Sequence, residues 1–277
     1  MSGEMQLGLT LPQFRADPEP MLTVARDADA GGIDGVFLFD HLFRVTRDGS
    51  RRPALECFGM LGAVAAETRR VTVGTLVVRA TLRPPATLAH GLRTAARLAP
   101  GRLVAGLGAG DSESRIENES FGLGFGTLEG RVGALRLAVE AARGHGFPVW
   151  VGGEAVNVGH VAAEAEGWNR WGVTADAFAA EAASVRQMVG ALGRDPDRFE
   201  LTWGGLVVLG ASDREAQAKA ERLGPGPGTI VGGPERVADA LRAVGAAGAS
   251  WAIVGPVDAS DPDNVGVLAE GVAPLLR

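Results

Sequence analysis

The sequence predicts an α/β fold, a (β/α)8 TIM barrel, formed by residues 1–277 as one domain. Short apolar runs alternate with longer segments of helical periodicity, and this alternation repeats eight times, as in parallel β/α units. Residues 35–39 are Gly-Val-Phe-Leu-Phe, an apolar run that is typical of a parallel strand buried on both faces. The chain has 277 residues, a length that suits one α/β barrel, and no linker divides it.

In the first half of the chain, strands are expected at residues 6–11, 35–39, 71–77 and 103–107. Pro12 ends the first strand, and Asp17-Pro18 begins a helix that Gly31-Gly32 ends. A second helix is expected over about residues 54–68. Pro84-Pro85 begins the third helix, because proline fits the first turn of a helix and disrupts its interior.

In the second half, strands are expected at residues 149–151, 167–171, 201–209 and 251–254. A polar loop follows the fourth strand up to about Gly126, and apolar residues at helical spacing come after it. Thr174 is predicted to cap one helix, and Ser212 opens a Ser-Asp-Arg-Glu capping box for the next. Pro234 occupies the first position of a further helix, and the last helix begins near Pro262.

An open, doubly wound sheet is the rival fold. That fold usually has a Gly-x-Gly-x-x-Gly motif at its first strand–helix turn, where glycines bring the backbone close to a phosphate. The first turn here is Pro12-Gln-Phe-Arg15, which favours the barrel.

Composition excludes several function classes. The net charge is −6 and no cluster of basic residues forms a stripe along a face, so nucleic acid is not expected as a partner. No apolar run is long enough to span a membrane, and the first residues do not resemble a signal peptide. Cys57 is the single cysteine, which rules out an internal disulfide and a thiolate zinc site. We therefore expect a cytoplasmic protein that acts on small molecules, without a metal.

Lysine and tyrosine usage indicates the source. Lys219 is the only lysine among 27 basic residues, there is no tyrosine, and glycine and alanine are abundant. This bias is typical of a GC-rich bacterial genome, such as that of an actinobacterium.

Asp40-His41 comes directly after the second predicted strand. All strand–helix loops of a barrel meet at one mouth, so polar residues there are candidates for a site. A carboxylate and an imidazole could orient a ligand and move a proton near neutral pH. The alternative is that Asp40 caps a loop and His41 is an ordinary surface residue. For His90, His145 and His160, their positions in helices or a turn favour a structural interpretation.

A glycine cluster, Gly106-Leu-Gly-Ala-Gly110, follows the fourth strand. It lacks the third glycine of the dinucleotide motif, but glycines let the backbone approach a flat or phosphorylated ligand closely. Asp111 then offers a carboxylate at the mouth. Residues 112–121 are too polar for the core, and a solvated loop is the alternative interpretation.

Two further places are weaker candidates. Gly152-Gly153 lies between a strand and a helix, where free amides could hold a phosphate, although a tight turn also explains it. Residues 75–79, Thr-Leu-Val-Val-Arg, could form a bulge that supports a ring, although a plain buried strand fits the pattern better.

Stretches of the sequence, in order and spacing, resemble a known family: residues 7–13, 30–36, 40–42, 65–75, 83–86, 100–110, 148–153, 166–168 and 232–238. Together they resemble the bacterial luciferase-like monooxygenase superfamily, and especially its deazaflavin-dependent oxidoreductase branch. The resemblance implies an eight-fold β/α barrel that binds coenzyme F420, or alternatively FMN, at its mouth.

The resemblance also implies roles for individual residues. His41 would be the proton donor, and Asp111 falls where some relatives have a glutamate acting as a base, although aspartate is one methylene shorter. The residues that would contact the cofactor are Asp40, Leu76, Val77, Arg79, Ala109, Gly110 and Ser114, with Gly152, Gly153, Ala155 and Val156 holding its phosphate. Leu76-Val77 would be a bulge that often contains a non-proline cis peptide.

Three alternatives remain open beside an F420-dependent oxidoreductase. They are an FMN-dependent monooxygenase, a protein that binds the cofactor without catalysis, and a barrel enzyme acting on a sugar phosphate, although the glycines usual for the last are missing around Gly255-Pro256. Relatives usually have a long segment before the fifth strand, whereas only about residues 144–147 intervene here, so the site could be open or covered by a second copy. The apolar helices are compatible with a homodimer.

Overall fold

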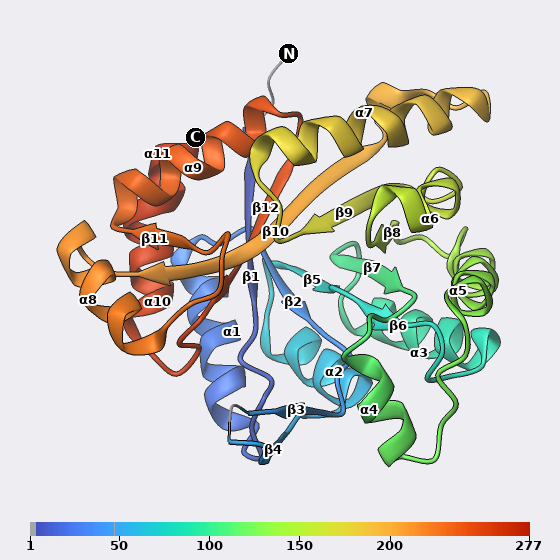
Figure 1. The fold of residues 1–277 in the computed structure, drawn as a ribbon, viewed down its shortest axis with the longest axis horizontal. Coiled ribbons are helices and arrows are strands. Elements are labelled where there is room, and N and C mark those ends of the chain that lie inside the picture. The colour runs from blue at the N-terminus through green and yellow to red at the C-terminus, as the bar shows by residue number, and fades with distance from the viewer. Residues whose placement is uncertain (1–3, 47) are drawn as a thin grey trace.

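Eight parallel strands close into a barrel in the computed structural model, which describes residues 4–46 and 48–277 (Figure 1). The barrel strands are β1 (Gln6–Thr10), β2 (Gly35–Leu38), β5 (Thr72–Thr75), β7 (Leu103–Gly108), β8 (Val149–Gly152), β9 (Gly167–Trp171), β10 (Glu200–Leu209) and β12 (Trp251–Pro256). Each pairs in parallel with the next in this order, and β12 pairs with β1 to close the ring. The predicted fold class is therefore confirmed.

Helices surround the barrel. They are α1 (Glu19–Gly31), α2 (Cys57–Glu67), α3 (Pro85–Leu98), α5 (Leu128–Ala142), α6 (Ala155–Ala162), α7 (Ala175–Ala191), α8 (Asp213–Leu223), α9 (Pro234–Ala246), α10 (Asp263–Gly266), the π-helical segment η2 (Val267–Val272) and α11 (Ala273–Leu276). The predicted caps form: the Thr174 hydroxyl accepts a hydrogen bond from the Ala177 amide, and that of Ser212 from the Glu215 amide. Gly32 ends α1 with a left-handed φ of 92°, a conformation that glycine adopts without strain.

Several short elements were not predicted. They are the antiparallel hairpin β3 (Phe43–Val45) and β4 (Arg51–Pro53), the strands β6 (Val78–Arg79) and β11 (Ile230–Gly232), the helix α4 (Ser114–Ser120) and the 3-10 turn η1 (Pro196–Arg198). All are shorter than the windows in which hydrophobic periodicity becomes visible. The predicted loop up to Gly126 is therefore wrong in part, because α4 forms within it.

The third predicted strand, residues 71–77, is also interrupted. β5 ends at Thr75, the peptide bond between Leu76 and Val77 is cis, and β6 continues by pairing with the end of β7. The plain buried strand that the residue pattern favoured is thus wrong, and the bulge implied by the family resemblance is present.

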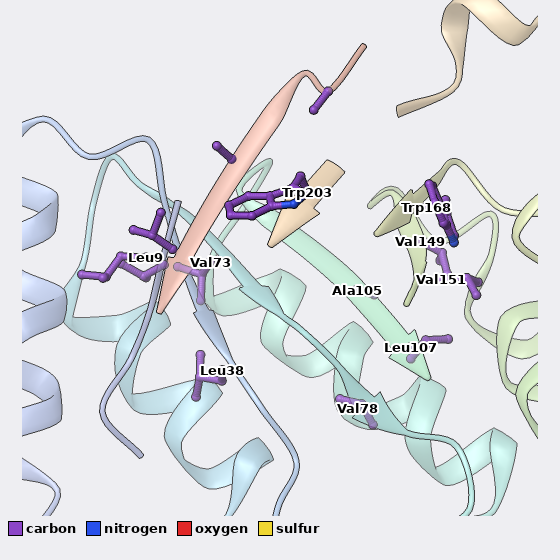
Figure 2. Packing of buried hydrophobic residues seen from close by; sticks show 14 of the residues in the cluster. Leu9, Leu38, Val73, Val78, Ala105, Leu107, Val149, Val151, Trp168 and Trp203 are labelled. Atoms are coloured by element: carbon purple, nitrogen blue, oxygen red, sulfur yellow. The ribbon is translucent and has the colours of Figure 1, made fainter. Parts of the chain in front are cut away.

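Two apolar layers hold the barrel together. The larger layer lies between strands and helices, and Figure 2 shows part of it, including Leu9, Leu38 and Val73. The smaller layer fills the barrel interior around Phe37, Trp150 and Trp251, whose ring centroids lie 5.7 to 5.9 Å apart. These side chains fill the middle of the barrel interior.

No helix within the described ranges is both long enough and apolar enough to cross a membrane. Nor do the described residues contain a group of three or more His, Cys, Asp or Glu side chains placed to hold a metal ion.

Candidate active site

A cavity of about 820 Å³ opens at the carboxyl-terminal ends of the strands. Every barrel strand, or the segment directly after it, contributes to the lining, through Thr10, Asp40, Val77, Gly108, Gly152, Asn169, Leu206 and Gly255. Most of the sequence-predicted site residues meet here: His41, Asp111, Asp40, Leu76, Val77, Arg79, Ala109, Gly110, Ser114, Gly152 and Gly153 all line the cavity. Ala155 and Val156 do not.

The cis peptide forms part of the cavity wall, and neighbouring glycines accommodate it. A Cβ atom on Gly108 would lie 2.4 Å from Val77 Cγ2, and one on Gly152 would lie 2.7 Å from Val77 Cγ1. Real Cβ atoms do not approach other atoms so closely, so Val77 occupies space that only glycine leaves free at both positions. The glycines after strands β7 and β8 thus shape this wall, in addition to any role they have toward a ligand.

The Asp40 carboxylate is buried and held by two arginines. Arg83 donates to both carboxylate oxygens, over 2.6 and 3.1 Å, and the Arg79 amide donates to Oδ2 over 3.1 Å. Burial alone would lower the pKa of Arg83, but hydrogen bonds and charges from Asp40 and Glu56 raise it above its usual value. These contacts fix Asp40 as a structural anchor at the cavity edge, where it positions the neighbouring His41.

His41 is paired with Glu117, a residue that sequence reasoning missed. Its Nδ1 lies 2.6 Å from Glu117 Oε1, and its side chain is 28% exposed toward the cavity. The ring also packs near Phe14 and Phe39, with centroids 5.6 Å away in each case. The other ring nitrogen, Nε2, makes no hydrogen bond within the described residues, so it is available to a ligand.

Glu117 lies on α4 and is 3% exposed. Its Oε2 accepts hydrogen bonds from the Leu42 amide over 2.6 Å and from Arg79 Nη2 over 3.1 Å. Burial would raise the pKa of this carboxyl, but the hydrogen bonds from His41 and Leu42 and the charges of His41 and Arg79 hold it below the usual 4.5. Glu117 is therefore ionised at neutral pH. Its Oε1 accepts a hydrogen bond from the N–H group at Nδ1 of His41.

A local signal for Glu117 does exist in the sequence. The buried residues of α4 are Ser114, Glu117 and Asn118, which have the i, i+3, i+4 spacing of one helical face. The periodicity is polar instead of apolar, so a search for amphipathic helices does not detect it. Asn118 on this face accepts a hydrogen bond from Arg79 over 3.2 Å, which joins α4 to the end of β6.

Asp111 lies three residues before the first residue of α4. Its Oδ1 accepts hydrogen bonds from the amide and the hydroxyl of Ser114, both over 2.9 Å. The carboxylate therefore stabilises the first turn of α4, and its role as a base stays a prediction.

The start of α6, where a phosphate is predicted to bind, is partly occupied by the chain itself. The Gly153 amide donates to the Asn169 carbonyl over 3.1 Å, and the Ala155 amide donates to Glu181 Oε2 over 2.8 Å. Val156 is 85% exposed. A phosphate at this helix end would have to compete with the Glu181 carboxylate.

Replacing Glu117 with glutamine is expected to lower the free energy of unfolding by about 2 kcal/mol at pH 7, because charged hydrogen bonds to His41 and Arg79 are lost. A carboxyl whose pKa is lowered by folding contributes stability above its unfolded pKa and loses it as the pH falls through the folded value. The difference in the free energy of unfolding between the wild type and Glu117→Gln should therefore shrink below about pH 4.5. Urea unfolding at pH 7 and at pH 3.5 measures it.

Glu119→Gln is the matched control, since Glu119 is exposed on the same helix and pairs only weakly with Arg115, over 3.7 Å. It should change stability by less than about 0.5 kcal/mol. A difference between the wild type and Glu117→Gln that does not depend on pH would contradict the assignment of Glu117 as the ionised partner.

Comparison with known proteins identifies the family. Residues 4–145, just over half of the chain, match the model of the luciferase-like monooxygenase family. The chain belongs to this family. The matched part contains the cis peptide, His41 and α4. The contact between His41 and Glu117, which the sequence did not predict, therefore lies within the segment that matches the family.

Curated relatives of this luciferase-like protein match over shorter segments. It is 38% identical over 100 residues to an F420-dependent glucose-6-phosphate dehydrogenase of Nakamurella multipartita, which covers 36% of this chain and 29% of the relative. It is also 38% identical over 109 residues to the enzyme of the same name from Beutenbergia cavernae, over 39% of this chain and 32% of the relative. The matched segment thus spans about a third of the length of these relatives.

Solved structures show the same luciferase-like fold. An F420-dependent secondary alcohol dehydrogenase in complex with an F420–acetone adduct superimposes with a TM-score of 0.81 at 16% identity, over 99% of this chain and all of the other. A riboflavin lyase with modified FMN superimposes with a TM-score of 0.80 at 14% identity, over 99% of this chain and 92% of the other. At such identities, the comparison shows the fold alone.

Proposed function

We propose that this luciferase-like protein is an oxidoreductase that transfers a hydride between coenzyme F420 and a small organic substrate. The observation that carries the proposal is His41, held by an ionised Glu117 at the edge of the cavity with Nε2 free. Relatives that share the matched segment are named as F420-dependent dehydrogenases, which supports the same choice. A cytoplasmic location and a homodimer belong to the proposal as well.

The cavity fits a flat, phosphorylated cofactor. Gly108, Gly110 and Gly152 line it without side chains, and Leu76-Val77 offers an apolar wall beside them. Gly110 has a φ of 75°, a left-handed conformation that glycine adopts without strain, and this lets the chain turn at the cavity lining. When bound, F420 supplies a ring carbon that accepts or donates a hydride, and the protein supplies position and proton transfer.

His41 moves the proton that accompanies the hydride. Since Nδ1 is bound to Glu117, Nε2 takes a proton from a substrate hydroxyl in the oxidation direction and returns it in the reduction direction. The Glu117 carboxylate stabilises the positive charge that forms on the ring during this transfer, and it prevents the ring from turning. Phe14 and Phe39 restrict the ring from the side of the β1 and β2 ends.

Glu181→Ala is expected to strengthen the binding of F420 by about 3- to 10-fold. The substitution frees the Ala155 amide and removes a negative charge from the start of α6, where the cofactor phosphate is proposed to bind. It also releases Arg170, whose Nε donates to Glu181 over 2.8 Å and which lines the cavity. Titration of the variant and the wild type with F420 at equal ionic strength measures the effect.

Asp176→Ala is the control. Asp176 is an exposed acidic residue in the first turn of α7, the helix that also carries Glu181. It removes one negative charge without freeing an amide of α6. Weaker binding of F420 to Glu181→Ala than to the wild type would argue that the phosphate lies elsewhere.

Equilibrium binding of F420 and of FMN, followed by quenching of the five tryptophans, tests the proposed cofactor. Binding of F420 alone, with a Kd at or below the order of a micromolar, supports the proposal and leads to a screen of alcohols, enones and imines for hydride transfer. Preference for FMN, together with flavin-dependent oxygen consumption, would replace it with a monooxygenase. Tight F420 binding without turnover on the whole panel would indicate a protein that binds the cofactor without catalysis.

A further inference from the structure

Three arginines at one corner of the cavity have no acidic partner in the described part of the chain. Arg15, Arg44 and Arg52 line the cavity, yet none of them forms an ion pair with a carboxylate in residues 4–46 and 48–277. The chain as a whole is acidic, with a net charge of −6, so a corner of the cavity lined by three arginines contrasts with the rest of the molecule. Three guanidinium groups that line one cavity concentrate positive charge there, which favours the binding of an anion from outside the chain.

The other cavity arginines contrast with these three. Arg79 is bonded to Glu117 and Asn118, and Arg170 is bonded to Glu181. Arg131 donates to the carbonyls of Ala109 and Gly126, which satisfies it without a carboxylate. The side chains of Arg79, Arg131 and Arg170 thus form hydrogen bonds that link elements of the site. No such hydrogen bonds are found for Arg15, Arg44 and Arg52 among the described residues.

Two features of the three arginines favour an anion beside them, although Arg44 and Arg52 are exposed to solvent. Arg44 on β3 is paired directly with Arg52 on β4, and like charges at directly opposed strand positions destabilise a hairpin. Arg44 also lies over the Phe14 ring, with 5.6 Å between the guanidinium carbon and the ring centroid, which holds it toward the cavity. The Nε atom of Arg15 is buried and has no hydrogen-bond partner among the residues that the structure describes. An anion placed between these groups would offset the repulsion between Arg44 and Arg52 and would accept a hydrogen bond from Arg15 Nε.

This corner is remote from the proposed phosphate site at the start of α6. Arg15 follows β1, and the β3–β4 hairpin is inserted after β2 (Figure 1). Around the closed ring, β8 is separated from β1 by four strand positions in either direction. The phosphate of a cofactor anchored after β8 would therefore lie on the opposite side of the mouth from these arginines. Asp258, which lies after β12 next to β1, has its carboxylate bonded to Ser260 and pairs with none of them.

We propose that Arg15, Arg44 and Arg52 bind an anionic group, a carboxylate or a phosphate, that the substrate carries. The inference rests on the proposed function for the reaction, and it adds the class of substrate. The preferred substrates are acidic alcohols or carbonyl compounds, and neutral analogues lack the group that these arginines hold. Arg44 and Arg52 can each offer paired N–H donors to such a planar or tetrahedral anion.

Titration calorimetry with inorganic phosphate tests the site without any cofactor. The wild type is expected to bind phosphate, and the double substitution Arg44→Gln/Arg52→Gln is expected to raise the Kd at least ~10-fold, because two charged hydrogen-bonding groups are lost. Arg15→Gln should weaken binding in the same direction. The control is Arg51→Gln/Arg214→Gln, which removes the same charge: Arg51 lies over Phe43 outside the cavity lining, and Arg214 is exposed on α8. Equal phosphate binding by the double variant and the wild type would overturn the proposal.

A second titration distinguishes the substrate from the cofactor as the source of the anion. F420 preparations with short and long oligoglutamate tails should bind the wild type and Arg44→Gln/Arg52→Gln with Kd values that agree within about 3-fold. A loss confined to the long-tailed cofactor would assign the arginines to the tail and overturn the substrate assignment. Failure of F420 to bind the wild type would remove the proposed function, while the phosphate titration would still test the arginine corner.

Discussion

Replacing His41 with alanine is expected to lower hydride transfer by ~100-fold or more while F420 affinity stays within about 3-fold of the wild type. Nε2 of His41 is the imidazole nitrogen that is free at the cavity, and Nδ1 is fixed by Glu117. Removing the ring removes the group that moves the proton, whereas the glycines and the Leu76-Val77 wall that shape the cofactor position remain. Single-turnover absorbance of F420 and titration of its binding measure the two quantities separately.

His90→Ala is the control for the loss of an imidazole, because His90 is exposed on α3 and does not line the cavity. It should leave turnover unchanged. Unchanged turnover in His41→Ala would end the assignment of His41. If the variant instead lost F420 binding as well, His41 would be a cofactor contact, and the proton donor would have to be sought elsewhere in the cavity.

Replacing Gly106 with alanine is expected to destabilise the protein by about 3 kcal/mol or more, or to prevent it from folding in soluble form. A Cβ atom at this position would lie 2.0 Å from the carbonyl oxygen of Thr75. The clash is with backbone, so no side-chain rotation relieves it. The Thr75 hydroxyl also donates to the Gly106 carbonyl over 2.8 Å, which binds these two strands closely just before the cis peptide.

Gly133→Ala is the matched control, since Gly133 is exposed on α5 and a Cβ atom there meets nothing within 4 Å. Alanine is favoured over glycine inside a helix, so this variant should be more stable by about 0.5–1 kcal/mol. Urea denaturation of both variants gives the comparison. A Gly106→Ala protein within about 0.5 kcal/mol of the wild type would show that β5 and β7 separate more easily than the structure indicates.

The barrel is the part of this protein that its sequence predicts best. Strands such as 35–39 are apolar throughout because both faces are covered, and Ser212 and Thr174 are capping residues whose bonding partners lie three residues away. Periodicity and capping are local properties, so they can be recognised in a short window of residues. The placement of Asp40-His41 at the mouth follows from the same local reading, because it comes directly after a strand.

The family resemblance predicted the interruption at Leu76-Val77, which the local residue pattern did not favour. Residue pattern alone predicted a plain strand through Leu76-Val77, whereas the resemblance implied the bulge and the cis peptide that the structure contains. The glycines that make room for Val77 come from β7 and β8, well separated from it along the chain. Their purpose becomes visible only when the three strands lie side by side.

The partners of the site residues were decided by tertiary structure alone. Glu117 is 76 residues from His41, and Arg83 is 43 residues from Asp40. No spacing rule connects such positions, because closure of the barrel and the short helix α4 bring them together. Glu181 and the Ala155 amide, which donates to it, are likewise 26 residues apart in the sequence. The sequence by itself thus determined the architecture and the residues at the strand ends, whereas the packing of distant segments decided which charges are paired and which, like Arg44 and Arg52, are left for a ligand.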